Sequence, residues 1–173
     1  MKKVFGIVGW SGCGKTDLTT RVISSLVKKK ILVASLKHTH HNFQIDKEGK
    51  DSDKHLKSGA NEVMIYNEKR WALFSAPQKN KTKIETVLEK FENDTEFVII
   101  EGLKFSKFPK IEVIRSSLKK PFIHDTDKNI KAIVTDKEIK YLKTKKLPIF
   151  KFCETEKIAN FIINYFKNDF PNL

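Results

Sequence analysis

The chain has 173 residues, of which 39% are hydrophobic, and it carries a formal net charge of +13. This length fits one compact domain, and no apolar run approaches the roughly 18 residues of a membrane-spanning helix. The apolar run after the basic start is too short for an export signal, and Cys13 and Cys153 cannot form a disulfide framework. We therefore expect a cytoplasmic protein.

The positive charge comes almost entirely from lysine. Only Arg21, Arg70 and Arg115 are arginines, whereas the 31 lysines are spread along the whole chain. Specific recognition of nucleic acid favours the planar fork of arginine. The pattern favours a solvated lysine-rich surface over a basic face for a polyanionic partner, and nucleic-acid binding is not expected.

The first apolar run, residues 4–8, predicts a short buried strand that leads into a glycine-rich turn. Residues 9–16 then match the phosphate-binding loop, G-x-x-x-x-G-K-[ST]. Glycines let successive backbone amides point at one anion, and the helix that follows adds its positive end. In such loops the lysine, here Lys15, reaches the β- and γ-phosphates, and the hydroxyl, here of Thr16, holds Mg²⁺.

The rest of the chain alternates between helical and strand patterns. We predict helices at 15–29, 51–58, 84–91 and 158–166, and strands at 31–37, 62–66, 71–74, 97–100, 111–115, 130–134 and 149–150. The strand–helix–strand pattern of the first 37 residues makes the first two strands parallel. The predicted fold is a single α/β domain, 1–173, with a mostly parallel, Rossmann-like three-layer sheet of the phosphate-loop NTPase type and a β-hairpin insertion at 61–75.

A long polar loop follows the strand that ends at Lys37, where α/β proteins often place functional residues. Its histidines, His38, His40, His41 and His55, match no four-ligand zinc spacing. Three interpretations stay open: a transition-metal site, hydrogen bonding to a phosphorylated ligand or partner together with Lys37 and Lys50, and ordinary loop histidines. In the same loop, Asp46 and Asp51 either orient magnesium ligands or face solvent.

Glu101 follows four apolar residues and precedes Gly102. In phosphate-loop proteins, an acid at the end of a buried strand beside the loop helps to hold Mg²⁺. The pattern therefore favours a metal site made by Thr16 and Glu101, and the alternative is a strand-end carboxylate that faces solvent.

Two further polar positions follow predicted strands. Thr135 and Glu138 fit a capping box for a helix that ends near Leu142, while Asp136 could accept the paired N–H groups of guanine. Arg115 is the first candidate for a bidentate charged contact, and a cross-strand ion pair is the alternative.

Together these motifs resemble the molybdopterin-guanine dinucleotide biosynthesis protein MobB family. The resemblance rests on the phosphate loop and on the segments K-H-T-H-H (37–41), I-D (45–46), G-K-D-S (49–52), G-A (59–60), E-G-L-K (101–104) and P-K-I-E-V-I-R (109–115). Asn42 and Gln44 stand where aspartates are expected in many relatives, and Glu48 stands where proline is often found.

The resemblance implies a GTP-binding accessory protein, usually dimeric, that hydrolyses GTP weakly and assists the MobA nucleotidyltransferase. It also implies that Gly12, Gly14, Lys15 and Thr16 bind phosphates, that Glu101 serves Mg²⁺, and that the loop at 38–51 faces the nucleotide or the partner. No finger arginine or water-positioning glutamine stands at the expected places, which predicts slow turnover. The alternatives are a small-molecule kinase and a GTP-dependent metal-delivery protein.

The candidate residues fall into three groups. Those predicted to bind the nucleotide are Gly9, Ser11, Gly12, Cys13, Gly14, Lys15, Thr16, Asp17 and Asp136. Lys15 and Glu101 would serve any hydrolysis, with Thr16 and Glu101 at the metal. Those predicted to face the partner or the pterin are Lys37, His38, His41, Asp46, Lys50 and Arg115.

Overall fold

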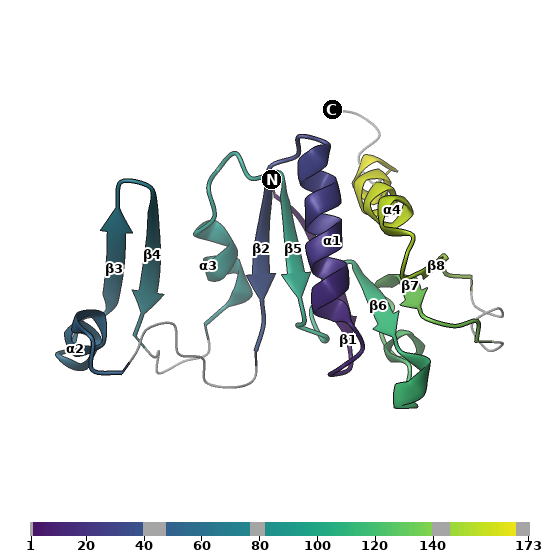
Figure 1. Cartoon of the computed structure of the whole chain (residues 1–173), viewed down its shortest axis with the longest axis horizontal. Coiled ribbons are helices and arrows are strands. Elements are labelled where there is room, and N and C mark those ends of the chain that lie inside the picture. Colours follow the sequence, from purple (N-terminus) through teal and green to yellow (C-terminus); the bar gives the residue numbers. More distant parts are fainter. Residues whose placement is uncertain (1, 40–47, 77–81, 140–145, 169–173) are drawn as a thin grey trace. The chain divides into compact units, whose positions relative to one another are not determined.

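The structure is a computed structural model that describes residues 2–39, 48–76, 82–139 and 146–168, and it divides into two compact units. The first unit comprises Met1–His38 and Glu92–Leu173, and the second comprises Thr39–Phe91. The elements are β1 (Lys3–Gly9), α1 (Lys15–Lys28), β2 (Val33–Lys37), α2 (Asp51–Lys57), β3 (Glu62–Asn67), β4 (Arg70–Ser75), α3 (Ile84–Glu89), β5 (Phe97–Glu101), β6 (Lys110–Ile114), β7 (Ile130–Thr135), β8 (Ile149–Lys151) and α4 (Thr155–Asn168) (Figure 1).

The first unit is built on a six-stranded sheet with the order β2-β5-β1-β6-β7-β8, in which every neighbouring pair is parallel. The first two strands along the chain, β1 and β2, are parallel as predicted, but β5 lies between them and pairs with both. The carboxyl ends of β2, β5, β1, β6 and β7 therefore meet at one edge of the sheet. This edge is where open α/β sheets bind ligands.

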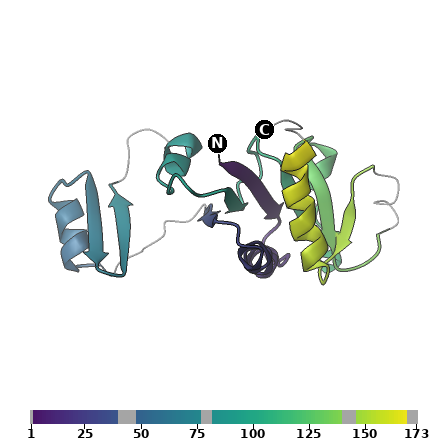
Figure 2. The same ribbon diagram turned by 90° about the horizontal axis from the view of Figure 1, so that it is seen from above.

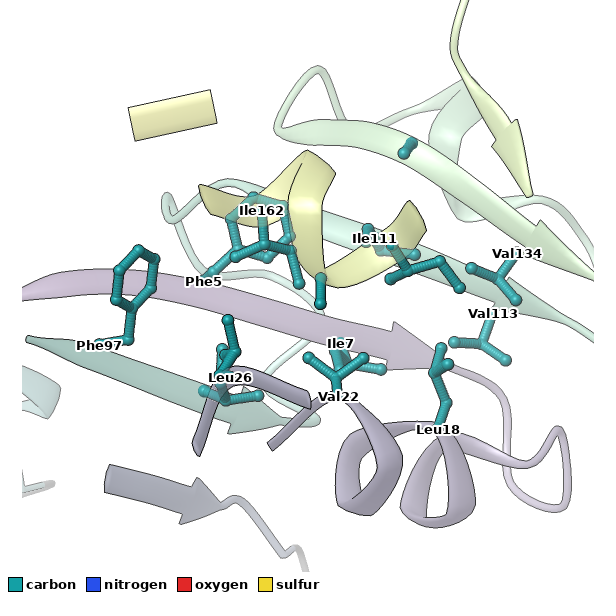
Figure 3. Close-up of a cluster of buried hydrophobic side chains, with 14 of the residues drawn as sticks. Phe5, Ile7, Leu18, Val22, Leu26, Phe97, Ile111, Val113, Val134 and Ile162 are labelled. Atoms are coloured by element: carbon teal, nitrogen blue, oxygen red, sulfur yellow. The ribbon is translucent and has the colours of Figure 1, made fainter. Parts of the chain in front are cut away.

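The helices α1 and α4 cover one face of this sheet and pack against each other. The apolar positions of α1 recur at intervals of four residues, so they form one stripe that is buried against the strands. Figure 3 shows Leu18, Val22 and Leu26 directed from α1 toward the strands, and Figure 2 shows α1 nearly end-on. This packing fixes the start of α1 relative to the end of β1.

Aromatic rings reinforce the contact between β1 and α4. The Phe5 ring meets those of Phe161, Tyr165 and Phe166 edge to face, with ring centroids 5.8–6.4 Å apart. Such pairs contribute about 0.5–1.5 kcal/mol each beyond the area they bury. The carboxyl-terminal helix is thus anchored on the strand that leads into the glycine-rich loop.

The second unit contains the predicted hairpin, formed by β3 and β4 in antiparallel register from Glu62↔Ser75 to Asn67↔Arg70. The Asn67 side chain accepts hydrogen bonds from the amides of Lys69 and Arg70 at 2.9 and 3.0 Å, which closes the two-residue turn. Val63 is buried in this unit, where α2 packs against β3.

The α/β class, the parallel sheet and the hairpin insertion are confirmed, whereas two local expectations differ from the structure. The second strand begins at Val33, because the amide of Ile31 still bonds to Leu26 O at the end of α1. Asp136–Ile139 are not helical, so the helix expected from the capping box is absent from those residues. The interpretation of the chain as one domain stays a prediction.

Candidate nucleotide-binding site

The glycine-rich loop, residues 9–16, joins the buried end of β1 to the start of α1. Gly14 is the N-cap of α1, with φ of 95°, and no side chain caps the helix there. A left-handed N-cap of this kind suits glycine, and it leaves the first-turn amides of α1 available to an anion. Gly9 is needed for a different reason, because an added Cβ would lie 2.5 Å from Val113 O and 2.6 Å from Cys13 Sγ.

Lys15 is the first residue of α1, and its side chain reaches back to the backbone of the loop. Its ammonium donates a hydrogen bond to Trp10 O at 2.9 Å and lies 3.9 Å from Cys13 Sγ. Burial raises the pKa of the Cys13 thiol despite the opposing charge of Lys15. Cys13 therefore stays a neutral thiol packed beneath the loop, while Ser11 and Gly12 are exposed at its tip.

Glu101 and Thr16 meet where β5 and α1 approach each other. The Thr16 hydroxyl donates to Glu101 Oε1 at 2.7 Å, and Lys37 Nζ lies 3.6 Å from the same oxygen. Lys37 and Glu101 are register partners at the ends of β2 and β5. The structure thus brings together the two residues that the sequence assigned to a metal, and their metal role stays a prediction.

The donor chemistry of this pair fits magnesium. Mg²⁺ prefers oxygen ligands and is usually held by one or two protein groups, with waters and phosphate oxygens completing its shell. Thr16 and Glu101 supply two such oxygens beside the loop. Within the part of the chain that the structure describes, no cluster of three histidine, cysteine, aspartate or glutamate side chains could hold a metal ion.

Asp17 lies in the first turn of α1 and is paired with Arg21. A hydrogen bond from Arg21 is the main reason that the pKa of Asp17 is lowered, and the charge of Arg115 adds to it. Arg21 also donates to Phe152 O at 2.7 Å and to the Thr155 hydroxyl. These bonds tie the turn between β8 and α4 to the second turn of α1.

Arg115 follows β6 and lies against the other side of the loop. Its guanidinium stacks on the Phe152 ring, 4.6 Å from the centroid, and Nη1 lies 3.8 Å from Asp136 Oδ2. An added Cβ at Gly14 would stand 3.0 Å from Arg115 Nη2. The cross-strand ion pair considered for Arg115 is therefore present.

Asp136 follows β7 and is held by Ser116, whose amide and hydroxyl donate to its two oxygens at 2.9 and 3.3 Å. Burial would raise the pKa of Asp136, but these hydrogen bonds and the charge of Arg115 outweigh it and lower the pKa. Thr135 caps no helix at residues 136–139, which are not helical: its hydroxyl donates to Lys137 O at 2.9 Å and accepts from the Lys137 amide at 3.4 Å within a turn. Guanine recognition by Asp136 stays a prediction.

The remaining predicted residues follow β2 along the chain. His38 directly follows β2, and its amide donates a hydrogen bond to Glu101 O at 2.9 Å. Lys50 belongs to the second unit, where it immediately precedes α2. His41 and Asp46 lie outside the described residues, as does His40.

Sequence reasoning missed the burial of two charged residues of β6. Lys110 is fully buried and donates to Lys104 O, Ser106 O and Asp127 Oδ2 at 2.9, 2.5 and 2.6 Å. Because side chains alternate along a strand, Lys110 and Glu112 lie on the same face of β6. Charged residues are ordinarily exposed, so the sequence alone did not predict that this face is buried.

Glu112 is the other buried charge of this strand. It accepts hydrogen bonds from the amides of Ile123 and His124 at 2.7 and 3.0 Å, and it lies 2.5 Å from His124 Nδ1. The segment between β6 and β7 that contains these two amides also contacts the glycine-rich loop, because Trp10 Nε1 donates a hydrogen bond to Pro121 O at 2.7 Å. Glu112 therefore fixes the segment that supports the loop from the side of β6.

Comparison with known proteins agrees with the architecture. The family model described as molybdopterin guanine dinucleotide synthesis protein B, MobB, matches residues 4–136. The chain is 33% identical over 163 residues to the molybdopterin-guanine dinucleotide biosynthesis adapter protein of Haemophilus influenzae, covering 94% of this chain and 88% of that protein. It is 26% identical over 168 residues to the Escherichia coli protein of the same name, covering 95% and 94%.

Solved structures give the same result. A crystal structure of molybdopterin-guanine biosynthesis protein B superposes with a TM-score of 0.73 at 27% identity, covering 95% of this chain and 99% of that one. Bacillus subtilis MobB superposes with a TM-score of 0.72 at 20% identity, covering 94% and 96%, which supports the fold alone. No helix among the described residues is both long and apolar enough to span a membrane. With a family model matched over most of its length and relatives aligned nearly end to end, the chain belongs to the MobB family.

Proposed function

We propose that this protein is a GTP-binding adapter in molybdopterin-guanine dinucleotide biosynthesis, where it assists a MobA-type guanylyltransferase. The adapter role is supported by the names of the relatives. Nucleotide binding is supported chiefly by one observation: the uncapped start of α1, Lys15 and the Thr16–Glu101 pair converge at the end of β1. Together these groups supply amides and an ammonium for phosphates, with two oxygens for a metal.

In this proposal each residue has a separate task. The amides at the start of α1 bind phosphate oxygens, and Lys15 leaves Trp10 O to reach the β- and γ-phosphates. Thr16 and Glu101 hold Mg²⁺, which when bound neutralises charge on the phosphates. Both arginines of the first unit, Arg21 and Arg115, contact Phe152 rather than Glu101, so we expect at most weak, slow GTP hydrolysis.

Thermal denaturation tests the choice of nucleotide. We expect GTP to raise the melting temperature more than ATP does, because Asp136 would accept two N–H groups of guanine that adenine lacks. Each Asp136 oxygen that already accepts a bond keeps a second lone pair. Ligand at a hundred times its Kd adds about 2.7 kcal/mol, or roughly 5–10 °C for a chain of this size. In Asp136→Asn the shifts with GTP and ATP should become equal, whereas equal shifts in the wild type would remove Asp136 from this role.

Thermal denaturation also tests whether Glu101 binds Mg²⁺. With Mg²⁺ present, the GTP-induced shift of the wild type should increase, and in Glu101→Gln this increase should be lost while a metal-independent shift remains. Glutamine keeps an oxygen that accepts from Thr16 but lacks the charge that attracts Mg²⁺. A variant that keeps the whole magnesium effect would contradict the role of Glu101. Glu138→Gln serves as the matched control on an acid that is not assigned to this site.

We also propose that the protein is a homodimer that associates through the hairpin of the second unit. Met64, Tyr66 and Trp71 are 57%, 72% and 51% exposed, and Tyr66 pairs with Trp71 across β3 and β4. Exposed apolar clusters of this kind often mark interaction surfaces. Sedimentation equilibrium should find a dimer for the wild type and for Val27→Lys, and a monomer for the double variant Tyr66→Lys/Trp71→Lys. A monomeric wild type would contradict this proposal.

A further inference from the structure

Arg115 occupies a distinct position relative to the proposed nucleotide. The strand that precedes it, β6, pairs with β1 along one edge, whereas β5, which carries Glu101, pairs with the opposite edge of β1. Arg115 and the Thr16–Glu101 pair therefore flank the glycine-rich loop from opposite sides. A metal held by Thr16 and Glu101 lies with the β- and γ-phosphates, so the β6 side is left to the phosphates nearer the nucleoside.

The guanidinium of Arg115 is held in place by its neighbours. The Phe152 ring lies 4.6 Å from the guanidinium carbon, and Asp136 lies 3.8 Å from Nη1. Both neighbours are themselves fixed: Ser116 donates twice to Asp136, and Arg21 donates to Phe152 O. An arginine oriented in this way loses less side-chain entropy when it binds a ligand.

The guanidinium also lies close to the loop at Gly14. The ring edge of Phe152 and Nη2 of Arg115 would lie 3.1 and 3.0 Å from a Cβ added at Gly14. Glycine at position 14 thus has two roles, since it accommodates the positive φ and lets a cation approach the backbone of the loop. The side chain of Arg115 is 39% exposed, which leaves it open to a ligand.

We propose that Arg115 is a nucleotide-binding residue that contacts the α- or β-phosphate from the β6 side, with Asp136 and Phe152 holding its guanidinium against the loop. This inference rests on the proposed function, because it assumes that a nucleotide occupies the glycine-rich loop. A guanidinium presents paired N–H donors that match two oxygens of a phosphate group.

Titration of the full-length protein with GDP and with GTP tests this assignment. In Arg115→Ala the affinity for both nucleotides should fall by about 10- to 100-fold, and by the same factor, because both carry the α- and β-phosphates. Arg115→Lys, which keeps the charge without the fork, should show a smaller fall for both. Arg70→Ala, which removes the same charge from the hairpin of the second unit, should bind like the wild type.

The outcomes separate the two proposals. Unchanged affinity of Arg115→Ala for both nucleotides overturns this inference, and so does a loss confined to GTP, which would indicate contact with the γ-phosphate. Should Arg115→Ala fail to fold, Arg115→Lys provides the same comparison of GDP with GTP. A wild type that binds neither nucleotide overturns the proposed function itself.

Discussion

Replacing Lys110 by methionine is expected to lower the free energy of unfolding by about 3–5 kcal/mol, measured by urea denaturation. Methionine matches the volume of the fully buried side chain but leaves Asp127 without its cation. Two backbone carbonyls, Lys104 O and Ser106 O, lose their donor at the same time. Removing one partner of such a pair is costly because the remaining carboxylate, whose side chain is only 14% exposed, keeps little contact with water.

Lys107→Met is the matched control, since it removes an exposed lysine three residues away. Its effect should stay within about 0.5 kcal/mol. The double variant Lys110→Met/Asp127→Asn should recover part of the loss, because no unpaired carboxylate remains. If Lys110→Met and Lys107→Met lower the free energy of unfolding by the same amount, the loss of the Lys110–Asp127 ion pair is not the cause of the destabilisation.

The pH dependence gives an independent check of this pair. Burial would raise the pKa of Asp127, but the hydrogen bond from Lys110, the hydrogen bonds from Asn129 and the charge of Lys110 together outweigh it, so its pKa in the folded protein is lowered. A lowered carboxyl pKa contributes stability above the unfolded-state pKa of about 3.9, and this contribution is lost as the pH falls through the folded-state value. The difference between wild type and Lys110→Met should therefore be largest near neutral pH and shrink below about pH 4.

The sequence predicted local features of this fold well, because their causes are local. The glycine-rich loop needs a fixed spacing of glycines before Lys15, and an apolar run before Glu101 predicts a buried strand with an acid at its end. Since carboxyl ends of parallel strands share one edge, the meeting of Glu101 with Thr16 followed from these two motifs. The hairpin was marked by two β-type runs around a polar turn.

The features that sequence reasoning missed depend on contacts distant in the chain. Nothing near β5 indicates that it lies between β1 and β2 in the sheet. Charged residues are ordinarily exposed, so the burial of Lys110 and Glu112 could not be anticipated from the local sequence. Their bonds to Asp127 and to the amides of Ile123 and His124 span more than ten residues. The capping box failed because Thr135 continues β7 and bonds within a turn, so tertiary pairing overrode a local helix signal.

Lys15→Ala is expected to weaken GTP binding by about 100-fold or more, measured by isothermal titration calorimetry. The lysine would form charge-assisted hydrogen bonds to the β- and γ-phosphates, each contributing roughly 1.5–3 kcal/mol, and its ammonium already lies against the loop backbone at Trp10 O. Truncation removes these bonds and leaves phosphate charge without its nearest cation. Wild-type affinity in this variant would contradict the assignment of the loop.

Lys28→Ala is the matched control, because Lys28 lies in the last turn of the same helix and is exposed. Both variants remove one positive charge, so a general effect of net charge on nucleotide binding would appear in both alike. Of these two lysines, Lys15 is the one that contacts the loop backbone, with its ammonium 2.9 Å from Trp10 O. A loss of affinity confined to Lys15→Ala, in a protein whose melting temperature without nucleotide is nearly unchanged, would therefore be due to the phosphate contact rather than to folding or overall charge.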